Sequence, residues 1–597
     1  MLRAMITLTG ALLLLCSAGT GQTRKVPGSW LTDYEKSGFR KTPRYAETID
    51  YCRRLQGASP WIRVDSFGQS GGGRPLYVVI ASTDGAFDPA SAARTGKAVV
   101  MIQNGIHAGE IDGKDASLML LRDIAITKTK AALLDHVILL VIPVYNVDGH
   151  ERISRFNRIN QQGPEEMGWR VTAQNLNLNR DYLKADAPET RAWLGLYTAW
   201  LPDFFVDCHV TDGADFQHVL TYAIETHENV AEPVRRWITR SYIPAVESTL
   251  VSRKVAVVPY IFFKDDRDPL KGLIGSVAPP RFSTAYTATQ NRPGLLIETH
   301  MLKDYKTRVD ATYAMLEASL ELVNRDHAEL RRAVTSADAQ AQAGLSGPFP
   351  LQFSTSETPN STVRFLGYRQ RTEKSDVSGG ERTIYSHDPY EAAIPRYDSA
   401  TVTLSVVPPS AYLIPRQWTE VIERLALHGL GLERLTEGAD LEVESYRFSD
   451  AHWQQTPFEG RHPVTYKVST VRERRSFPPG TVLLRMNQRA ARVALNALEP
   501  QAPDAFAAWG FFDAVFEQKE YAEDYVMETV AREMLAKDPK LKEEFESKLR
   551  SDTAFAANPS ARLHFFYERS PYWDTQMNLY PVARLMRDTA LKSEPLR

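Results

Sequence analysis

The stretch AVVMIQNGIHAGE, residues 98–110, decides how this chain folds. Its first five residues are all apolar, which is typical of a strand buried on both faces. The glycine-punctuated turn that follows presents an imidazole, His107, and then a carboxylate, Glu110. A turn at a strand end can aim both side chains at one point, and zinc accepts both as ligands. Alone, such a His-x-x-Glu pair is more often a local contact in a loop than a metal site.

Length and charge restrict the possible classes of protein. A chain of 597 residues is too long for one ordinary domain, so two or three domains are expected. Its 71 Lys and Arg residues nearly balance its 73 Asp and Glu residues. This balance provides no electrostatic footprint for nucleic acid or for an anionic membrane. We therefore expect no nucleic-acid partner, and no stretch after the N-terminal segment reads as a membrane span.

The N-terminus has the pattern of a signal peptide. Arg3 supplies the positive charge, residues 5–16 are mainly apolar, and small residues follow at 17–21. An apolar run of this length is too short and too poorly flanked for a membrane helix. We therefore expect residues 1–21 to be removed and the protein to be exported, to a periplasm or outside the cell.

The three cysteines suggest no disulfide framework. Cys16 could indicate a lipid anchor, but the bulky Leu15 before it argues against one. Without the signal segment the chain keeps Cys52 and Cys208, which could form one disulfide in an oxidising compartment. Successive strand residues point to opposite faces, so Cys208 is not expected to share a metal with His209.

Further apolar strands are predicted at residues 137–143, 203–207 and 294–297, with helical patterns between them. Apolar strands that alternate with helices favour a mostly parallel mixed sheet covered by helices on both faces. The predicted fold class is therefore α/β, followed by an additional α+β C-terminal region. Sheets of this kind place their chemistry at the carboxyl ends of the strands.

Composition also predicts the domain boundaries. A helix predicted over residues 311–332 closes the α/β unit, and residues 336–347 are rich in Ala, Gln, Ser and Gly, which is typical of a linker. The predicted units are a main α/β domain at 22–335, the linker at 336–347, an α/β accessory region at 348–450 and a helix-rich accessory region at 451–597.

Polar motifs follow the later strands. NVDG at residues 146–149 follows the second strand, NLNLNRDY occupies residues 175–182, His209 ends the third strand and Glu298 ends the fourth. Each has an ordinary explanation on its own. Asn-x-Asp-Gly is usually a turn, a strand-final His is usually a hydrogen-bonded edge residue, and a Glu there usually faces solvent.

Together and in this order, the motifs resemble the zinc carboxypeptidase family of the carboxypeptidase A and B type. The resemblance covers about residues 45–332 and implies that family's fold, one zinc ion per chain and a peptide substrate with a free C-terminal carboxylate. The roles that it implies are zinc ligation by His107, Glu110 and His209, general base catalysis by Glu298, and binding of the terminal carboxylate by Asn179 and Arg180.

This chain departs from the family's pattern beside the zinc ligands. Asn177 stands where the family often has an acidic partner for the first histidine ligand. An amide oxygen still accepts the imidazole N–H, but it makes the ligand less basic than a carboxylate would. For the arginine that stabilises the developing oxyanion, Arg170 fits best by spacing, Arg158 is an alternative and Arg155 a weaker one.

The specificity pocket cannot be aligned with the family. Arg281 and Tyr286 lie where the family keeps pocket residues and are candidates to touch substrate. Structural roles are equally compatible with the sequence: a salt bridge within a loop for Arg281, and core packing for Tyr286.

Three functions fit these observations. The leading hypothesis is an exported zinc exopeptidase that hydrolyses the C-terminal peptide bond, with zinc-activated water and Glu298 as general base. A second is a cell-wall amidase or endopeptidase that cuts stem peptides. A third is a non-catalytic peptide-binding protein on the same fold, which the complete set of ligands together with Glu298 disfavours. The sequence after Gly347 carries no motif that assigns it a role.

Overall fold

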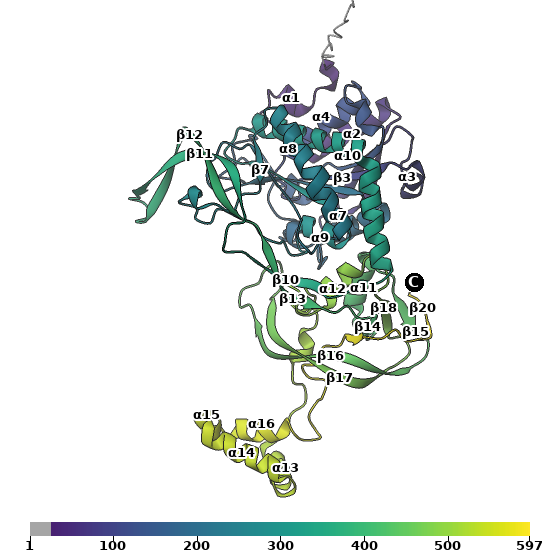
Figure 1. Cartoon of the computed structure of the whole chain (residues 1–597), viewed down its shortest axis with the longest axis vertical. Helices are drawn as coiled ribbons and strands as arrows, with labels where there is room; N and C mark the ends of the chain where they lie inside the picture. Colours follow the sequence, from purple (N-terminus) through teal and green to yellow (C-terminus); the bar gives the residue numbers. More distant parts are fainter. Residues whose placement is uncertain (1–25, 597) are drawn as a thin grey trace, which may run out of the picture.

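The computed structural model describes residues 26–596 (Figure 1). The predicted signal segment, residues 1–21, lies outside the described residues. An N-terminal unit, residues 26–342, contains the large α/β sheet, and a C-terminal unit, residues 349–596, contains a second sheet with separate helices. In Figure 1 the second sheet lies below the N-terminal unit, and α13 to α16 lie below that sheet.

Eight strands form the sheet of the N-terminal unit, in the order β1-β2-β4-β3-β5-β9-β6-β7. The neighbours β4-β3, β3-β5, β5-β9 and β6-β7 are parallel, whereas the other pairs are antiparallel. The strands are β1 Ile62–Gln69, β2 Pro75–Ala81, β3 Ala98–Asn104, β4 Val137–Ile142, β5 Phe204–Thr211, β6 Leu220–Ile224, β7 Val257–Pro259 and β9 Gly294–His300. A mostly parallel mixed sheet is therefore confirmed.

Helices cover both faces of this sheet. They are α1 Asp33–Lys36, α2 Tyr45–Ala58, α3 Pro89–Thr95, α4 Asp112–Ala125, α5 Val147–Glu151, α6 Pro188–Trp200, α7 Glu232–Trp237, α8 Ile243–Ser252, α9 Ser283–Thr289 and α10 Tyr305–Gln342. Side chains of β3 alternate between two cores. Val100 and Ile102 pack in the core with α4 and α10, whereas Val99 and Met101 pack in the core with α6 and α9. Burial on both faces explains why this strand is apolar throughout.

The predicted linker at 336–347 is wrong over its first half, because α10 continues to Gln342. Alanine and glutamine are good helix formers, so the composition that suggested a linker also supports a long helix. The helix ends just before Gly344, whose φ of 97° is costly for other residues.

The C-terminal unit is built on a seven-stranded sheet in the order β17-β16-β19-β14-β18-β15-β20. Its elements are β14 Ala411–Ile414, α11 Thr419–Leu427, β15 Glu433–Leu435, β16 Ala439–Trp453, β17 Val464–Phe477, β18 Val482–Arg485, α12 Ala491–Leu498, β19 Ala583–Leu585 and β20 Ser593–Pro595. The predicted boundary at residue 450 falls inside β16, and β16 pairs with β17 along most of its length. A division there would cut a hairpin, so the two predicted accessory regions share one sheet.

Four helices pack around an apolar core of their own: α13 Asp524–Lys537, α14 Pro539–Ser551, α15 Thr553–Ala556 and α16 Pro559–Tyr567. We call them the helical excursion. The chain leaves the sheet unit after Phe516 and returns at Asn578, whose N–H donates to the carbonyl oxygen of Val515 at 2.8 Å. Both ends of the excursion therefore meet at one place.

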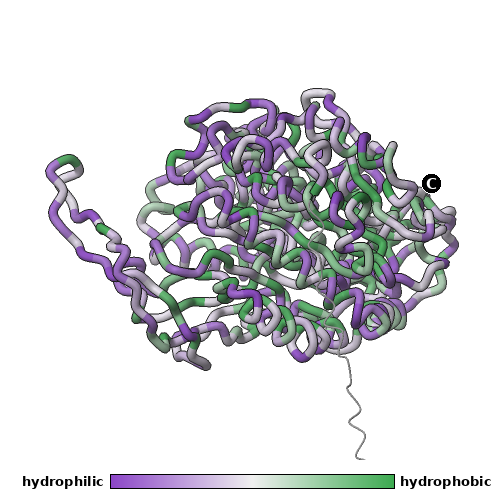
Figure 2. The backbone as a smooth tube through the Cα atoms, turned by 90° about the horizontal axis from the view of Figure 1, so that it is seen from above, coloured by the Kyte–Doolittle hydropathy of each residue, from purple (hydrophilic) through white to green (hydrophobic). Residues whose placement is uncertain are grey.

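A long antiparallel hairpin joins β11 Ser361–Lys374 to β12 Glu381–Tyr397. Figure 2 shows this hairpin as an arm that is mostly hydrophilic and stands away from the body. Two residues of β12 pair with the short strand β8 Leu273–Ile274 of the N-terminal unit. β10 Phe349–Thr355 and β13 Ala400–Val406, which flank this hairpin in the chain, pair antiparallel as a separate two-stranded sheet.

Cys52 and Cys208 are both buried and free, so the disulfide that the sequence left open does not form here. Both side chains pack in the apolar core that contains α4 and α10. Within residues 26–596, no helix combines the length and the apolar character needed to cross a lipid bilayer.

Candidate metal centre

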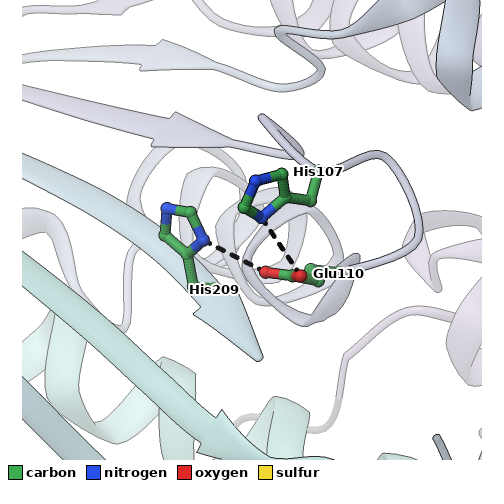
Figure 3. Close-up of side chains that lie close together, drawn as sticks. All are labelled: His107, Glu110 and His209. Atoms are coloured by element: carbon green, nitrogen blue, oxygen red, sulfur yellow. Dashed lines mark hydrogen bonds and ion pairs between the residues drawn. The ribbon is translucent and has the colours of Figure 1, made fainter. Parts of the chain in front are cut away.

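Three buried side chains converge at the carboxyl ends of β3 and β5 (Figure 3). His107 and Glu110 lie in the turn after β3, and His209 lies near the end of β5. Gly105 opens the turn with a φ of 66°, and the Glu110 N–H donates to the His107 carbonyl oxygen at 2.9 Å. One ligand atom from each of the three residues lies within 4.8 Å of the others. They could therefore hold a metal ion.

Both imidazoles turn Nδ1 toward the carboxylate. His107 Nδ1 lies 3.1 Å from Glu110 Oε1, and His209 Nδ1 lies 3.1 Å from Glu110 Oε2 (Figure 3). The contact between the buried His107 Nδ1 and Glu110 Oε1 has an ion-pair distance but not the geometry of a hydrogen bond, so this nitrogen forms no hydrogen bond within the described residues. A buried polar atom without a partner is rare and costly, and a cation between the three side chains would satisfy it. Two imidazoles and one carboxylate are a donor set that suits zinc.

The outer nitrogen of each imidazole faces an oxygen. His107 Nε2 lies 3.0 Å from Asn177 Oδ1, where the sequence predicted the partner of the first ligand. His209 Nε2 lies 3.0 Å from Oδ2 of Asp207, a residue that sequence reasoning missed. Asp207 precedes His209 by two positions on one strand, so both point to the same face. That period-two spacing is the signal that could have found it. Such partners fix the ring orientation and leave Nδ1 for a metal.

Burial and neighbouring charges set the protonation of this group. Burial lowers the pKa of His107 to about 4, although Glu110 opposes the shift. Burial alone would raise the pKa of Glu110, but His107 and Arg158 hold it well below its usual range. The carboxylate and the first imidazole are therefore in the forms that bind a cation.

Two arginines meet at Glu110 Oε1. Arg158 Nη1 lies 2.8 Å from this oxygen and Arg170 Nη1 lies 3.2 Å from it. Arg158 is otherwise tied down, since its Nε donates to Gln161 at 2.7 Å. The Arg170 side chain is 44% exposed, compared with 12% for Arg158. Arg170 is therefore the freer of the two guanidinium groups.

Glu298 lies on β9, directly beside His209 of the neighbouring parallel strand. Its side chain is buried, and Oε2 has no hydrogen-bond partner in the part of the chain that the structure describes. Burial raises the pKa of Glu298 to about 8; the charge on His209 opposes this shift and Glu110 adds to it. A carboxyl group with a raised pKa beside a metal site has the properties of an acid–base catalyst.

Asn179 and Arg180 lie in a short 3-10 helix, Leu178–Arg180. Within residues 26–596, Arg180 forms no ion pair, and its Nη1 donates to the Asn179 carbonyl oxygen at 2.7 Å. The neighbouring Asp181 pairs with Lys184 instead. The Arg180 guanidinium lies 4.3 Å from the centre of the Phe282 ring. Asn179 Oδ1 is buried without a partner among the described residues. Both side chains are therefore available to a ligand.

One cavity of about 860 Å³ joins these groups. Its lining includes His107, Glu110, Arg158, Arg170, Asn179, Arg180, His209 and Glu298. Tyr260, which no sequence motif indicated, also lines the cavity. Its hydroxyl group hydrogen-bonds the Thr211 hydroxyl group at 3.0 Å.

Arg281 and Tyr286 do not line this cavity. Arg281 pairs with the buried Asp504 of the C-terminal unit at 2.7 Å. Tyr286 is fully buried and its hydroxyl hydrogen-bonds His428 Nδ1 at 2.9 Å. The structure thus gives both residues the structural alternatives, a salt bridge and core packing, in place of the predicted contact with substrate.

Comparisons with known proteins agree with this geometry. Residues 48–213 match the sequence model described as zinc carboxypeptidase. The chain is similar to carboxypeptidase 2 of Trichophyton rubrum, with 25% identity over 78% of this chain and 84% of that protein. Carboxypeptidase 2 of Trichophyton tonsurans gives the same shares and identity. The matched share is larger than residues 22–335 alone could supply, so the similarity extends into the C-terminal unit.

A metallo-carboxypeptidase structure from Burkholderia cenocepacia covers 47% of this chain and 69% of its own length, with 20% identity and a TM-score of 0.35. The family match spans both histidines and the glutamate of the buried group. Over residues 48–213 the chain is therefore similar to the zinc carboxypeptidase family, and together with the similarity to carboxypeptidase 2 this supports a metallocarboxypeptidase, an enzyme that hydrolyses peptide bonds.

Proposed function

We propose that this protein is a zinc-dependent exopeptidase that removes the C-terminal residue of a peptide. The observation that carries the proposal is the Arg180 guanidinium, which lines the metal-site cavity without a carboxylate partner among the described residues. A desolvated arginine needs an anion, and its planar fork matches a terminal carboxylate. Asn179 Oδ1, also without a partner among residues 26–596, lies beside it.

His107, Glu110 and His209 would hold the zinc ion. Bound zinc polarises a scissile carbonyl and lowers the pKa of water toward about 7. Glu298 takes the proton from the attacking water and passes it to the leaving amine. Arg170, the freer of the two arginines at Glu110, stabilises the developing oxyanion, with Arg158 as the alternative.

Recognition of the terminal carboxylate sets the reaction type. With that carboxylate held by Arg180 and Asn179, the cleaved bond is the one next to the chain end. We also propose that the protein is exported, because residues 1–21 have the composition of a signal peptide.

Paired substrates test the proposal. A peptide with a free C-terminus and the same peptide as an amide are compared on the wild type, Arg180→Ala and Arg180→Lys. Losing one partner of a buried charge pair costs about 2–5 kcal/mol, so amidation should lower kcat/KM by about 30-fold to several thousand-fold. Arg180→Ala should abolish the preference for the free acid, and Arg180→Lys should restore part of it. Arg532→Ala, an arginine that is 76% exposed on α13, is the matched control.

Zinc content is measured for each variant and should not change. Equal cleavage of the acid and the amide, before and after Arg180→Ala, would indicate an amidase or endopeptidase. Binding of the peptide without cleavage in zinc-replete protein would indicate a non-catalytic peptide-binding protein.

A further inference from the structure

We propose that the C-terminal unit positions the active site, through a turn at residues 458–461 that holds the clamp segment, residues 177–186. The clamp segment contains the outer partner of a zinc ligand and both carboxylate-binding residues. The inference rests on the proposed function for its kinetic part, but its metal-binding part does not require a substrate.

The first step is a direct hydrogen bond between the units. The backbone N–H of Asn177 donates to Glu459 Oε2 at 2.8 Å. Asn177 Oδ1 in turn faces His107 Nε2 at 3.0 Å and accepts from the Asn179 N–H at 3.0 Å. One carboxylate of the C-terminal unit therefore fixes the residue that orients a metal ligand and starts the turn to Arg180.

The turn is shaped for close approach to this segment. Glu459 has a φ of 50° and Gly460 a φ of 78°, so two successive residues adopt a left-handed conformation. A Cβ at Gly460 would lie 3.2 Å from Leu176 Cδ2, just before the clamp segment. This conformation is uncommon for a residue other than glycine, asparagine or aspartate. Its presence at Glu459 indicates that contacts around the turn hold it in place.

The far end of the clamp segment is held as well. Arg461 donates two hydrogen bonds to the Asp186 carboxylate, from Nε and from Nη2, each at 2.7 Å. His428 Nε2 lies 2.8 Å from the Leu183 carbonyl oxygen, and Arg424 Nε donates to the Lys184 carbonyl oxygen at 3.0 Å. These anchors all belong to the C-terminal unit.

The C-terminal unit also holds the residues against which Arg180 packs. Asp504 is buried, accepts from the Arg281 backbone N–H at 2.6 Å and pairs with the Arg281 guanidinium at 2.7 Å. The next residue, Phe282, carries the ring that lies 4.3 Å from the Arg180 guanidinium. The C-terminal unit thus sets both the segment that carries Arg180 and the surface on which it rests.

The clamp segment has little regular structure to hold its own shape. Its only helical turn is Leu178–Arg180, and Asn179 departs from helical geometry there, with φ −77° and ψ 22°. Segments of this kind lose much conformational entropy on ordering. The Asp181 side chain accepts hydrogen bonds within the second half of the segment, from Lys184 and from the Asp186 N–H, so the first half, which carries Asn177 and Arg180, gains most from contacts outside the segment. The positioning role of the turn follows from this dependence.

Glu459→Ala and Glu459→Gln test the inference in the full-length protein. Glutamine keeps an oxygen that can accept the Asn177 N–H, whereas alanine does not. Glu459→Asn is the second short variant, because asparagine tolerates a positive φ but its side chain is one methylene shorter. Glu442→Ala, an exposed glutamate on β16 with the same change of charge, is the matched control.

Zinc affinity is measured by competition with a chromogenic chelator at fixed pH. Loss of the residue that hydrogen-bonds a metal ligand typically lowers metal affinity by about 10- to 100-fold. Glu459 does not contact the ligand itself but hydrogen-bonds Asn177, which does, so Glu459→Ala should lower zinc affinity by a smaller factor, about 3- to 10-fold. In kinetics with the free-acid peptide, KM should rise more than kcat falls. Glu459→Gln should return both values toward those of the wild type, and Glu459→Asn should resemble the alanine variant.

The inference would be overturned if folded Glu459→Ala and Glu459→Asn had the same zinc affinity and the same KM as Glu442→Ala. Equal losses in the alanine and glutamine variants would also overturn it, because the hydrogen bond would then play no part. A wild type that does not cleave peptides would refute the proposed function, whereas the zinc measurements would still test the role of Glu459.

Discussion

Replacing Asp207 with asparagine should weaken zinc binding. Asp207 is fully buried between two groups: Oδ2 faces His209 Nε2 at 3.0 Å, and Oδ1 accepts from Gln103 Nε2 at 3.0 Å. Asparagine has one oxygen instead of two, so an NH₂ group must face either His209 or Gln103. No water can easily replace the lost acceptor at a site this buried.

The size of the loss follows from this arrangement. Removing the outer partner of a ligand lowers metal affinity by about 10- to 100-fold, which corresponds to about 1.4–2.7 kcal/mol. We expect the upper part of this range for Asp207→Asn, because a donor would oppose a donor in the buried position. Competition with a chelator at fixed pH measures the affinity, and thermal unfolding of the metal-free protein shows whether the fold is intact.

Asp338→Asn is the matched control, because Asp338 pairs with Arg292 at 2.8 Å in the N-terminal unit, outside the cavity lining. The control should keep the zinc affinity of the wild type. A zinc affinity of folded Asp207→Asn within about twofold of wild type would show that Asp207 does not support the ligand.

Four further results are expected. Purified protein should carry about one zinc per chain, and His209→Ala should lose most of it, which metal analysis measures; full occupancy in that variant would exclude His209 as a ligand. Asn177→Asp should raise zinc affinity, because a carboxylate makes its imidazole partner more basic, and a weaker affinity would contradict this. Glu298→Gln should keep its zinc and lose about 10²–10⁴-fold in kcat, so near-normal turnover would rule out its role as base. Burial lowers the pKa of His428 to about 4. Its unfolded value is about 6.5, so the unfolded state binds more protons between these values and stability falls as the pH drops through them. Tm should therefore fall less from about pH 6.5 to 4 in His428→Gln, and an equal fall would speak against a neutral buried imidazole.

The sheet could be predicted because its strands are apolar on both sides. The runs at 98–102 and 137–143 lie between two cores, so every residue of each strand carries the signal. The ligands could be proposed because the motifs at or just after the strand ends together resemble those of the zinc carboxypeptidase family, and the structure brings His107, Glu110 and His209 together. Local sequence therefore contained the centre of the site.

Other features depend on partners far along the chain. Arg281 pairs with Asp504, 223 positions later, and no local pattern encodes that choice between a salt bridge and substrate. The contact between Asn177 and Glu459 spans 282 positions. The linker was wrong for another reason, since alanine-rich composition is compatible with both a helix and a loop.

The helical excursion closes a long loop on the C-terminal sheet, with its ends joined by the hydrogen bond between Asn578 and Val515. An apolar core of its own holds α13 to α16 together as one compact unit. If the excursion unfolded first, β19 would be connected to the rest of the C-terminal sheet through an unfolded chain, residues 517–577. Loop closure becomes less favourable by about 0.6 kcal/mol with each doubling of loop length. Replacing residues 517–577 with a tight turn would halve the loop length about four times, so the free energy of loop closure would improve by about 2.4 kcal/mol. The folding of the excursion and the pairing of β19 are thus thermodynamically coupled, although few contacts join them.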